Sequence, residues 1–228
     1  MSKLKCFLFY ATLGLIISIF LFLDPEQAWA RAGGARSKGG GIAALILWPF
    51  FVIYGMILMR KIRKRALETA QLVLRFSAAD SAWELTHLES AVRTAFPIVQ
   101  LAWMKRDQDI CRAYVTDNLY AQHKQQTDAL IGKHRTNILE NIILNDVLIV
   151  QARDEPDNSK DCFWAFINGK MVDYEVDDKT KKITDGDKKL RDFMELWQFK
   201  RHGDQWLLNQ IDSEVTLSDI EIIRYKLT

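Results

Sequence analysis

Cysteine is scarce in this sequence, and so is net charge. Its 228 residues include 3 cysteines, of which Cys6 lies near the amino terminus. Cys111 and Cys162 have no cysteine or histidine at metal-ligand spacing, which argues against a disulfide scaffold and against a zinc site. We therefore predict that these two thiols are reduced and structural.

The formal net charge is only +2, with 49% apolar and 26% charged residues, a composition that excludes a wholly disordered or collagen-like chain. This small net charge is the sum of two parts of opposite sign. Residues 1–65 hold 10 basic and 2 acidic side chains, a balance of +8, whereas residues 66–228 hold 21 and 27, a balance of −6. The acidic part shows no basic stripe and repels phosphate, so we expect no direct nucleic-acid binding.

Residues 1–30 have the layout of a secretory signal peptide. Lys3 and Lys5 precede a charge-free run, Cys6–Leu23, and small residues follow at Ala28-Trp29-Ala30. The run is also long enough to span a bilayer if tilt is tolerated. We predict cleavage after Ala30, with an uncleaved first transmembrane helix as the alternative.

A glycine-rich stretch occupies residues 31–41. A phosphate-binding loop requires Gly, four residues, and then Gly-Lys-Ser/Thr, and here Gly39 is followed by Gly40. We therefore predict a flexible linker.

Ile42–Met59 is eighteen residues without a charge, which cover about 27 Å as a helix, close to the thickness of the hydrocarbon core of a bilayer. A buried soluble helix normally keeps a polar face, and this run has none. Pro49 and Gly55 would weaken a soluble helix but are common in membrane spans. We predict a transmembrane helix over residues 42–59.

Five cations follow this run within six positions: Arg60, Lys61, Arg63, Lys64 and Arg65. Basic residues collect on the cytoplasmic side of membrane spans. Whether or not the first segment is cleaved, this rule places the carboxyl-terminal domain in the cytoplasm or the equivalent organellar compartment. We predict a bacterial or organellar inner or plasma membrane protein, single-pass after cleavage, whose cations can also contact lipid headgroups.

Residues 60–80 are predicted to form a basic juxtamembrane stalk, and residues 81–228 a folded domain. The domain begins with apolar residues spaced by three or four positions, which predict one helix with an apolar stripe: Leu85, Leu88, Val92, Phe96, Val99 and Trp103.

Further helices and then strands follow. Pro97 predicts a kink in the first helix. Asp107 or Asp109 is predicted to cap a second helical segment, and Thr116 a third that runs to Leu130. The later sequence is rich in β-formers and alternates, which predicts strands at 138–152, 162–176, 193–201 and 205–212, with a charged loop over 177–189. The order predicts an α+β fold with helices on one face of an antiparallel sheet of about four strands.

Several motifs, in this order, resemble those of the Tim44-like domain family. They are Ala102–Asp107 (AWMKRD), Met171–Tyr174 (MVDY), and an ending formed by Phe193–Arg201, Trp206-Leu207-Leu208 and Ile211. The resemblance covers about residues 84–213, and the leader, linker and single span are similar to those of bacterial members.

The resemblance implies a cystatin-like or nuclear-transport-factor-two-like cone, in which a curved sheet and helices enclose an apolar pocket. It also implies a docking and membrane-association module rather than an enzyme, with relatives that include a membrane-anchored ribosome receptor and a mitochondrial ribosomal protein. The mitochondrial import subunit carries a chaperone-binding segment before this domain. This chain has a span in that place, which argues against a chaperone-recruiting role.

Enzymes on this fold place Asp, His and Tyr inside the cone, which makes candidates of Asp173, Tyr174, His87, His123 and His134. By strand alternation Asp173 lies with charged neighbours on the solvated face, opposite Tyr174. The histidines at 123 and 134 are flanked by polar residues. We therefore predict that the histidines are surface side chains and that the chain has no catalytic site.

Two further sets of residues are candidates for sites. The first set is the acidic residues around Gly186, namely Asp177, Asp178, Asp185 and Asp187. Lysines interrupt them, so they do not follow the calcium-loop pattern. We therefore predict no metal and no cofactor. Five aromatic residues are predicted to form the core or to line a pocket: Trp103, Phe166, Trp197, Phe199 and Trp206.

These observations lead to a hypothesis of function. The chain would be a non-catalytic, membrane-anchored scaffold that docks a protein partner, such as translocation or insertion machinery, a ribosome or a membrane complex. The alternative is a domain that binds lipid or a small apolar ligand, with an isomerase or dehydratase on the same fold behind it.

Overall fold

The computed structural model describes residues 40–220, except for the side chains of positions 40–46 and 48. The chain divides into two compact units, Met1–Gly55 and Met56–Thr228. The predicted signal segment and residues 31–39 of the predicted linker lie outside the described residues. Gly40 and Gly41, the last two residues of the predicted linker, instead begin helix α3 (Gly40–Ser77). Among the described residues, no helix combines the length and apolar character needed to cross a membrane.

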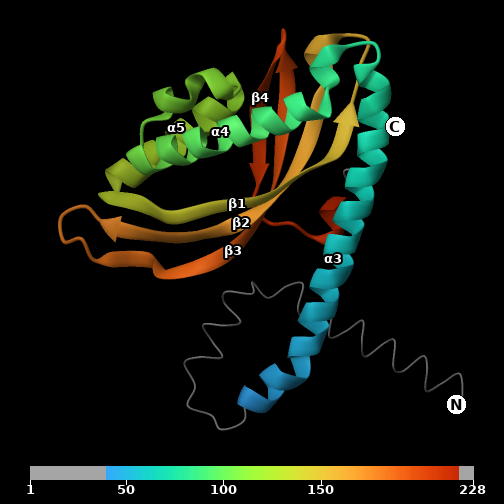
Figure 1. Cartoon of the computed structure of the whole chain (residues 1–228). Helices are drawn as coiled ribbons and strands as arrows, with labels where there is room; N and C mark the ends of the chain where they lie inside the picture. The colour runs from blue at the N-terminus through green and yellow to red at the C-terminus, as the bar shows by residue number, and fades with distance from the viewer. Residues whose placement is uncertain (1–39, 221–228) are drawn as a thin grey trace, which may run out of the picture. The chain divides into compact units, whose positions relative to one another are not determined.

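The larger unit is an α+β structure, as the order of sequence patterns predicts (Figure 1). Four antiparallel strands form one sheet in the order β1-β2-β3-β4, so each strand pairs with its neighbour in sequence. The helices are the end of α3, η1 (Ser81–Trp83), α4 (Leu85–Lys105), η2 (Gln108–Tyr114), α5 (Asp117–Gly132) and η3 (Asn158–Lys160). The strands are β1 (Arg135–Arg153), β2 (Cys162–Asp177), β3 (Ile183–His202) and β4 (Gln205–Asp212).

Short polar side chains begin the helices at the positions that the sequence predicts. Asp107 accepts a hydrogen bond from the amide of Asp109 at the start of η2, and Thr116 accepts one from the amide of Leu119 at the start of α5. Both caps are therefore confirmed. The apolar stripe of α4 is buried in its middle, but Leu85 at its first position is 38% exposed.

The predicted charged loop at 177–189 is wrong in its extent. The turn is confined to residues 178–182, and β3 already begins at Ile183. Asp187 pairs with Asp173, and Gly186 with Tyr174, across the sheet. Backbone pairing thus continues the ladder through residues whose charged side chains face solvent, and alternation of apolar side chains cannot reveal such a strand.

The sheet has an apolar core on each face. The front core lies under α4 and contains, among others, Phe163, Trp197 and Phe199. The rear core joins two residues of α3, Leu58 and Ile62, to side chains of opposite orientation on the same strands: Val150, Trp164, Phe166 and Leu196. Successive side chains of β2 therefore contribute to the front core and the rear core in turn, because both faces of the strand are covered.

Helix α3 from Met56 onward is consequently part of the folded unit. Ile62 and Val73 of this helix are almost fully buried, and the compact unit that contains them begins at Met56. Leu58, the penultimate residue of the predicted span, is only 2% exposed within the rear core.

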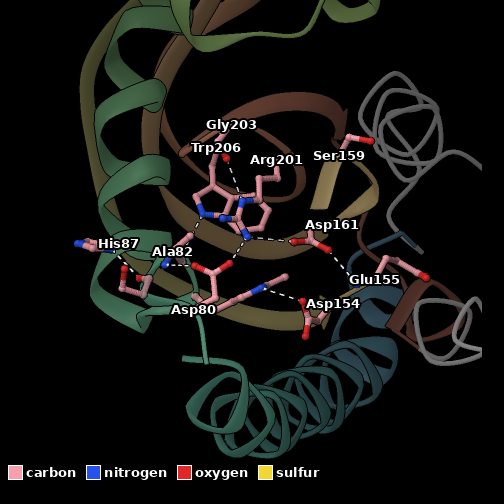
Figure 2. A network of polar contacts seen from close by, with 12 residues as sticks. Asp80, Ala82, His87, Asp154, Glu155, Ser159, Asp161, Arg201, Gly203 and Trp206 are labelled. Carbon is pink, nitrogen blue, oxygen red and sulfur yellow. Dashed lines mark hydrogen bonds and ion pairs between the residues drawn. The ribbon is translucent and has the colours of Figure 1, made fainter. Parts of the chain in front are cut away.

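A buried ion network closes one end of this unit (Figure 2). The guanidinium of Arg201 donates to the carboxylates of Asp80 and Asp161, and its Nε donates to the carbonyl of Gly203 at 2.9 Å. The side chain of Arg201 is 6% exposed and that of Asp161 is fully buried. The hydrogen bond from Arg201 lowers the pKa of Asp80, with a further contribution from the amide of Ala82.

Two indoles strengthen the same junction. Trp206 donates to the carbonyl of Ala82 at 3.1 Å, and Trp83 donates to Asp154 at 3.2 Å. The two rings meet edge to face, with centroids 4.8 Å apart. The loop after α3, the β1–β2 connection and the β3–β4 hairpin are thereby joined at one point.

Both cysteines of the described residues are buried and unpaired, as predicted. Burial raises the pKa of the Cys111 thiol and of the Cys162 thiol, which keeps both protonated and unreactive.

The first prediction concerns Gly169 of β2. A Cβ there would overlap the backbone oxygen of Ile143 and lie 2.7 Å from the ring of Phe193. Gly169→Ala is expected to lower the free energy of unfolding by about 1–3 kcal/mol, because the backbone of β1 must move. Gly132→Ala is the control, since no atom lies within 4 Å of that position and alanine favours the helix. Urea unfolding of both variants tests this, and equal stabilities would contradict it.

The second prediction concerns the buried guanidinium. Arg201→Met removes the charge that compensates Asp161, and we expect a loss of about 3–5 kcal/mol in unfolding free energy. Lys124→Met removes one partner of the exposed pair Lys124–Asp128 and is expected to cost about 0.5 kcal/mol or less. Chemical denaturation measures both, and a comparable cost for the two substitutions would refute the structural role of Arg201.

Candidate functional site: a carboxylate-lined cavity

A cavity of about 470 Å³ opens on the front face of the sheet, between α4, α5 and the strands. Its volume falls in the range of small-molecule sites. Its wall combines three kinds of side chain. The polar ones include Gln100, Asn118, Gln122, His123, Gln126, Asn137, Asn209 and Gln210; the acidic ones are Asp173, Glu195 and Asp212; and the apolar ones include Val99, Trp103, Leu119, Leu139, Met171 and Ile211.

The charge of this wall has one sign. Three carboxylates contribute to it, and no lysine or arginine is among the described residues that line it. Amide side chains, which both donate and accept hydrogen bonds, make up much of the remainder. The cavity is therefore acidic and rich in hydrogen-bonding groups, which differs from the apolar pocket that the family resemblance implies.

Glu195 reaches the cavity because of its place in β3. Phe193, Glu195, Trp197 and Phe199 alternate toward the front face, so the carboxyl group follows the same direction as three aromatic rings. Its Oε2 accepts a hydrogen bond from the indole of Trp197 at 2.7 Å. Burial raises the pKa of Glu195, the indole opposes this, and the negative charge of Asp173 raises it further.

Asn137 on β1 connects this region to Asp173 on β2. Its Nδ2 donates to a carboxylate oxygen of Asp173 at 2.6 Å. A carboxylate only accepts, so this contact fixes which way the amide points. Asn137 is 8% exposed, and its Oδ1 has no hydrogen-bond partner among the described residues.

His123 and Trp103 form an aromatic part of the wall. Their rings meet edge to face at 5.5 Å between centroids, with His123 coming from α5 and Trp103 from α4. Burial lowers the pKa of His123, so the imidazole is neutral near pH 7. The prediction that His123 is a surface residue in polar surroundings is corrected, because it is half-buried in the cavity wall.

The other candidates for catalysis do not assemble around these residues. Asp173 is exposed, as predicted, but it also lines the cavity. Tyr174 points to the opposite face, where its hydroxyl donates to Glu140 at 2.9 Å. His87 and His134 are exposed and lie outside the cavity wall.

The five aromatic residues predicted as core or pocket occupy three environments. Trp197, Phe199 and Trp206 belong to the front core, and Phe166 to the rear core. Trp103 is half-buried and is the member of the set that lines the cavity.

The acidic residues at the start of the β2–β3 turn make hydrogen bonds and an ion pair within the protein. Asp177 accepts hydrogen bonds from Lys179 and Thr180 within the turn, and Asp178 is paired with Arg106 at 2.8 Å. Within the described residues, no group of three or more His, Cys, Asp or Glu side chains could hold a metal ion.

The basic cluster lies on α3, and its members differ in their surroundings. Arg60, Arg63 and Lys64 are exposed, while Lys61 and Arg65 are half-buried. Glu68 pairs with both Lys64 and Arg65 on the next turn of the helix. Part of the cluster's positive charge is thereby compensated within the helix itself.

Sequence reasoning missed Glu195, although a signal for it exists. A single carboxylate in an alternating row of aromatic residues places a charge on the apolar face of a strand, which is costly unless the site uses it. Asn137 had no comparable signal, because its burial depends on pairing with β2.

The open antiparallel sheet, covered by helices and holding a polar cavity, is an α+β domain. More specifically, the chain belongs to the Tim44-like domain family, whose model matches residues 69–213. No curated protein matches the chain. Among solved structures, it is similar to the intermembrane space region of the chloroplast protein ARC6, at 9% identity and a TM-score of 0.36, over 55% of this chain and 97% of that one.

The third prediction follows from the environment of Glu195. Folding raises the pKa of the Glu195 carboxyl group above its ordinary value of 4.5. The free energy of unfolding therefore decreases as the pH rises from that ordinary pKa through the pKa of the folded state. Glu195→Gln keeps an acceptor for Trp197 and removes the charge, so it is expected to unfold at a higher temperature than the wild type near pH 7. The difference should shrink as pH falls below the ordinary value.

Asp192→Asn is the matched control, since Asp192 lies on the same strand with its side chain 78% exposed. It should leave the melting temperature almost unchanged. Thermal unfolding monitored by circular dichroism across this pH range gives both results. A Glu195→Gln variant that is less stable than the wild type at neutral pH would contradict the assignment of a desolvated charge.

Proposed function

We propose that this protein is a non-catalytic scaffold that holds a Tim44-like domain at a membrane and docks a protein partner there. The observation that carries the proposal is the continuity of α3. One helix, Gly40–Ser77, includes the charge-free run of the sequence and also supplies Leu58 and Ile62 to the rear core of the domain. A chain built in this way couples an apolar segment directly to a binding domain.

The proposed membrane segment lies on the same helix. It is the charge-free run at residues 42–59, which at 1.5 Å per residue covers about 27 Å. Its second-last residue, Leu58, also packs in the rear core of the domain. Phe50, Phe51 and Met56 are more than half exposed, as lipid-facing residues would be.

The basic cluster gives the proposal its direction. Arg60 and Arg63 follow the span and are exposed, which favours a cytoplasmic or equivalent organellar side for the domain. The same side chains can contact anionic headgroups of a bacterial or organellar inner membrane, each contributing about 1 kcal/mol. The partner would belong to the translocation or insertion machinery, to a ribosome or to a membrane complex.

The alternative of an apolar or lipid ligand is weakened by the cavity itself. Its carboxylates and amides would lose water without gaining hydrogen bonds if a hydrocarbon chain entered. An isomerase or dehydratase is also disfavoured, because Tyr174 faces away from the cavity that Asp173 and His123 line.

The fourth prediction tests the membrane segment. Phe50→Arg combined with Ile53→Arg puts two charges in the middle of the apolar run. We expect the wild-type chain to remain in membranes washed with alkaline carbonate and the double variant to be extracted, because each buried charge costs about 2.5–3.5 kcal/mol. Leu67→Arg combined with Leu74→Arg adds the same charge at positions 71% and 72% exposed on the same helix and should stay in the membrane.

The same three chains test docking. Crosslinking in intact membranes followed by mass spectrometry should recover a protein partner with the wild-type chain and much less of it with the Phe50→Arg/Ile53→Arg variant. Extraction of the wild-type chain by carbonate would overturn the anchoring proposal. Recovery of a co-purifying small molecule and no protein partner would overturn the scaffold proposal.

A further inference from the structure

One stretch of β3 has a neighbouring strand on one side only. β4 pairs with β3 over residues 196–202, so the part of β3 before Leu196 lies at the outer edge of the described sheet (Figure 1). Backbone N–H and C=O groups at the open edge of a sheet can pair with a strand from another chain. This edge is therefore a template for association with a polypeptide strand.

Bulges limit how much of the open edges is regular. β3 has a bulge at residues 188–190, where it has two more residues than β2 between neighbouring pairs. β1, the strand at the opposite edge, has three register shifts in its pairing with β2. Bulges protect an edge from pairing with another chain. Arg191–Glu195, by contrast, pairs with residues 167–171 of β2 without a shift and lies between the bulge and the end of β4.

The sequence of Arg191–Glu195 is complementary to itself in an antiparallel arrangement. When two copies pair about Phe193, Arg191 of each copy lies opposite Glu195 of the other, and both side chains are on the front face. Asp192 then lies opposite Met194, and Phe193 opposite Phe193 of the other copy.

Neighbouring registers lack this complementarity. A shift by one residue toward β4 places Asp192 opposite Glu195, and like charges directly opposite each other are destabilising. A shift in the other direction places Glu195 opposite Leu190, which belongs to the bulge. The register centred on Phe193 therefore uses all five residues and also opposes charges of unlike sign.

We propose that two copies of this chain associate by antiparallel pairing of Arg191–Glu195, so that their sheets join edge to edge and Arg191 of each copy forms an ion pair with Glu195 of the other. Such an interface has twofold symmetry, and each contact occurs twice. The same five residues on both copies supply the backbone groups and the charges.

The surroundings of Glu195 in the single chain support this pairing. Its carboxylate accepts from the indole of Trp197 at 2.7 Å, and no lysine or arginine is among the described residues that line the cavity beside it. Burial and the negative charge of Asp173 raise the pKa of Glu195, and a guanidinium from a second copy would lower it again.

Arg191 can make this contact at little cost. Its side chain is 62% exposed and is paired with Asp187 at 2.6 Å within the chain. An exposed ion pair of this kind contributes little to stability, so its exchange for a contact with Glu195 of another copy costs little.

The size of the interface sets its strength. Five residues on each copy are fewer than the about 20–30 on each side of a stable protein interface. We therefore expect a reversible dimer with a dissociation constant on the order of 10 µM. The inference does not depend on membrane attachment, because every residue that it uses belongs to the unit beginning at Met56.

The fifth prediction is that cysteines at opposed positions form a disulfide between copies. Full chains in detergent, all with Cys6→Ser, carry either Asp192→Cys or Met194→Cys and are mixed under mild oxidation. Cβ atoms directly opposite each other in antiparallel strands are about 4.5–5.5 Å apart, close enough for a disulfide after a small shift. We expect at least about fivefold more crosslinked dimer from the mixture than from either variant alone.

The matched control for crosslinking is a mixture of Asp192→Cys with Leu190→Cys. Leu190 is 49% exposed and Met194 40%, but residue 190 does not lie opposite residue 192 in the proposed register. Cys111 and Cys162 are buried, so they should not contribute to crosslinking. This mixture should give no more dimer than Asp192→Cys alone.

A charge reversal tests the ion pair. Arg191→Glu places two carboxylates opposite each other at both symmetric contacts, and we expect the dissociation constant from sedimentation equilibrium to rise by about tenfold or more. Lys189→Glu makes the same change of charge in the bulge, outside the paired residues, and should change it by less than about twofold. Circular dichroism verifies that both variants are folded.

Each result either supports or overturns the inference. A wild-type chain that stays monomeric up to about 100 µM, or equal crosslinking in both mixtures, would overturn it. Equal effects of Arg191→Glu and Lys189→Glu would overturn the ion pair between copies. Crosslinking of Asp192→Cys in membranes to a different protein, without a dimer, would assign this edge to another partner. Membrane extraction is not involved, so this proposal and the scaffold proposal fail separately.

Discussion

The buried guanidinium of Arg201 is the constraint on which the arrangement of this domain depends. A charge with a 6% exposed side chain requires partners, and those partners come from segments far apart in the sequence. Asp80 follows α3, Asp161 precedes β2, and Gly203 lies in the β3–β4 turn. By binding all three, Arg201 fixes where α3 ends relative to the sheet and thus where α4 crosses its front face (Figure 2).

Helix caps and strand order were predictable because they depend on local chemistry. Asp107 and Thr116 have the side chains that helix starts require, and alternation reveals the buried halves of β2 and β3. The rest depends on pairing. The first third of β3 is exposed, so nothing in its apolar pattern marks it as a strand. Likewise, Ile62 lies within the basic cluster and Val73 follows it in sequence, and only the rear and front cores show why they are buried.

In the cavity wall, the half-buried carboxyl group of Glu195 lies beside tightly packed aromatic side chains. Trp197 and Phe199 are fully buried on the same face of β3 as Glu195, so the carboxyl group is held by neighbours that cannot move aside. The alternation of Phe193, Glu195, Trp197 and Phe199 in the sequence indicates that Glu195 lies on the apolar face of the strand. It does not indicate that this face borders a cavity at Glu195 rather than a closed core.

The double role of α3 has a consequence for the order of synthesis. Leu58 and Ile62 leave the ribosome long before Trp164 and Leu196, the residues that will cover them. Because these two residues of α3 are made before the strands that cover them, their side chains stay open to solvent, or to an assisting protein, until β2 and β3 have been made. The rear core can therefore form only late in the synthesis of the domain.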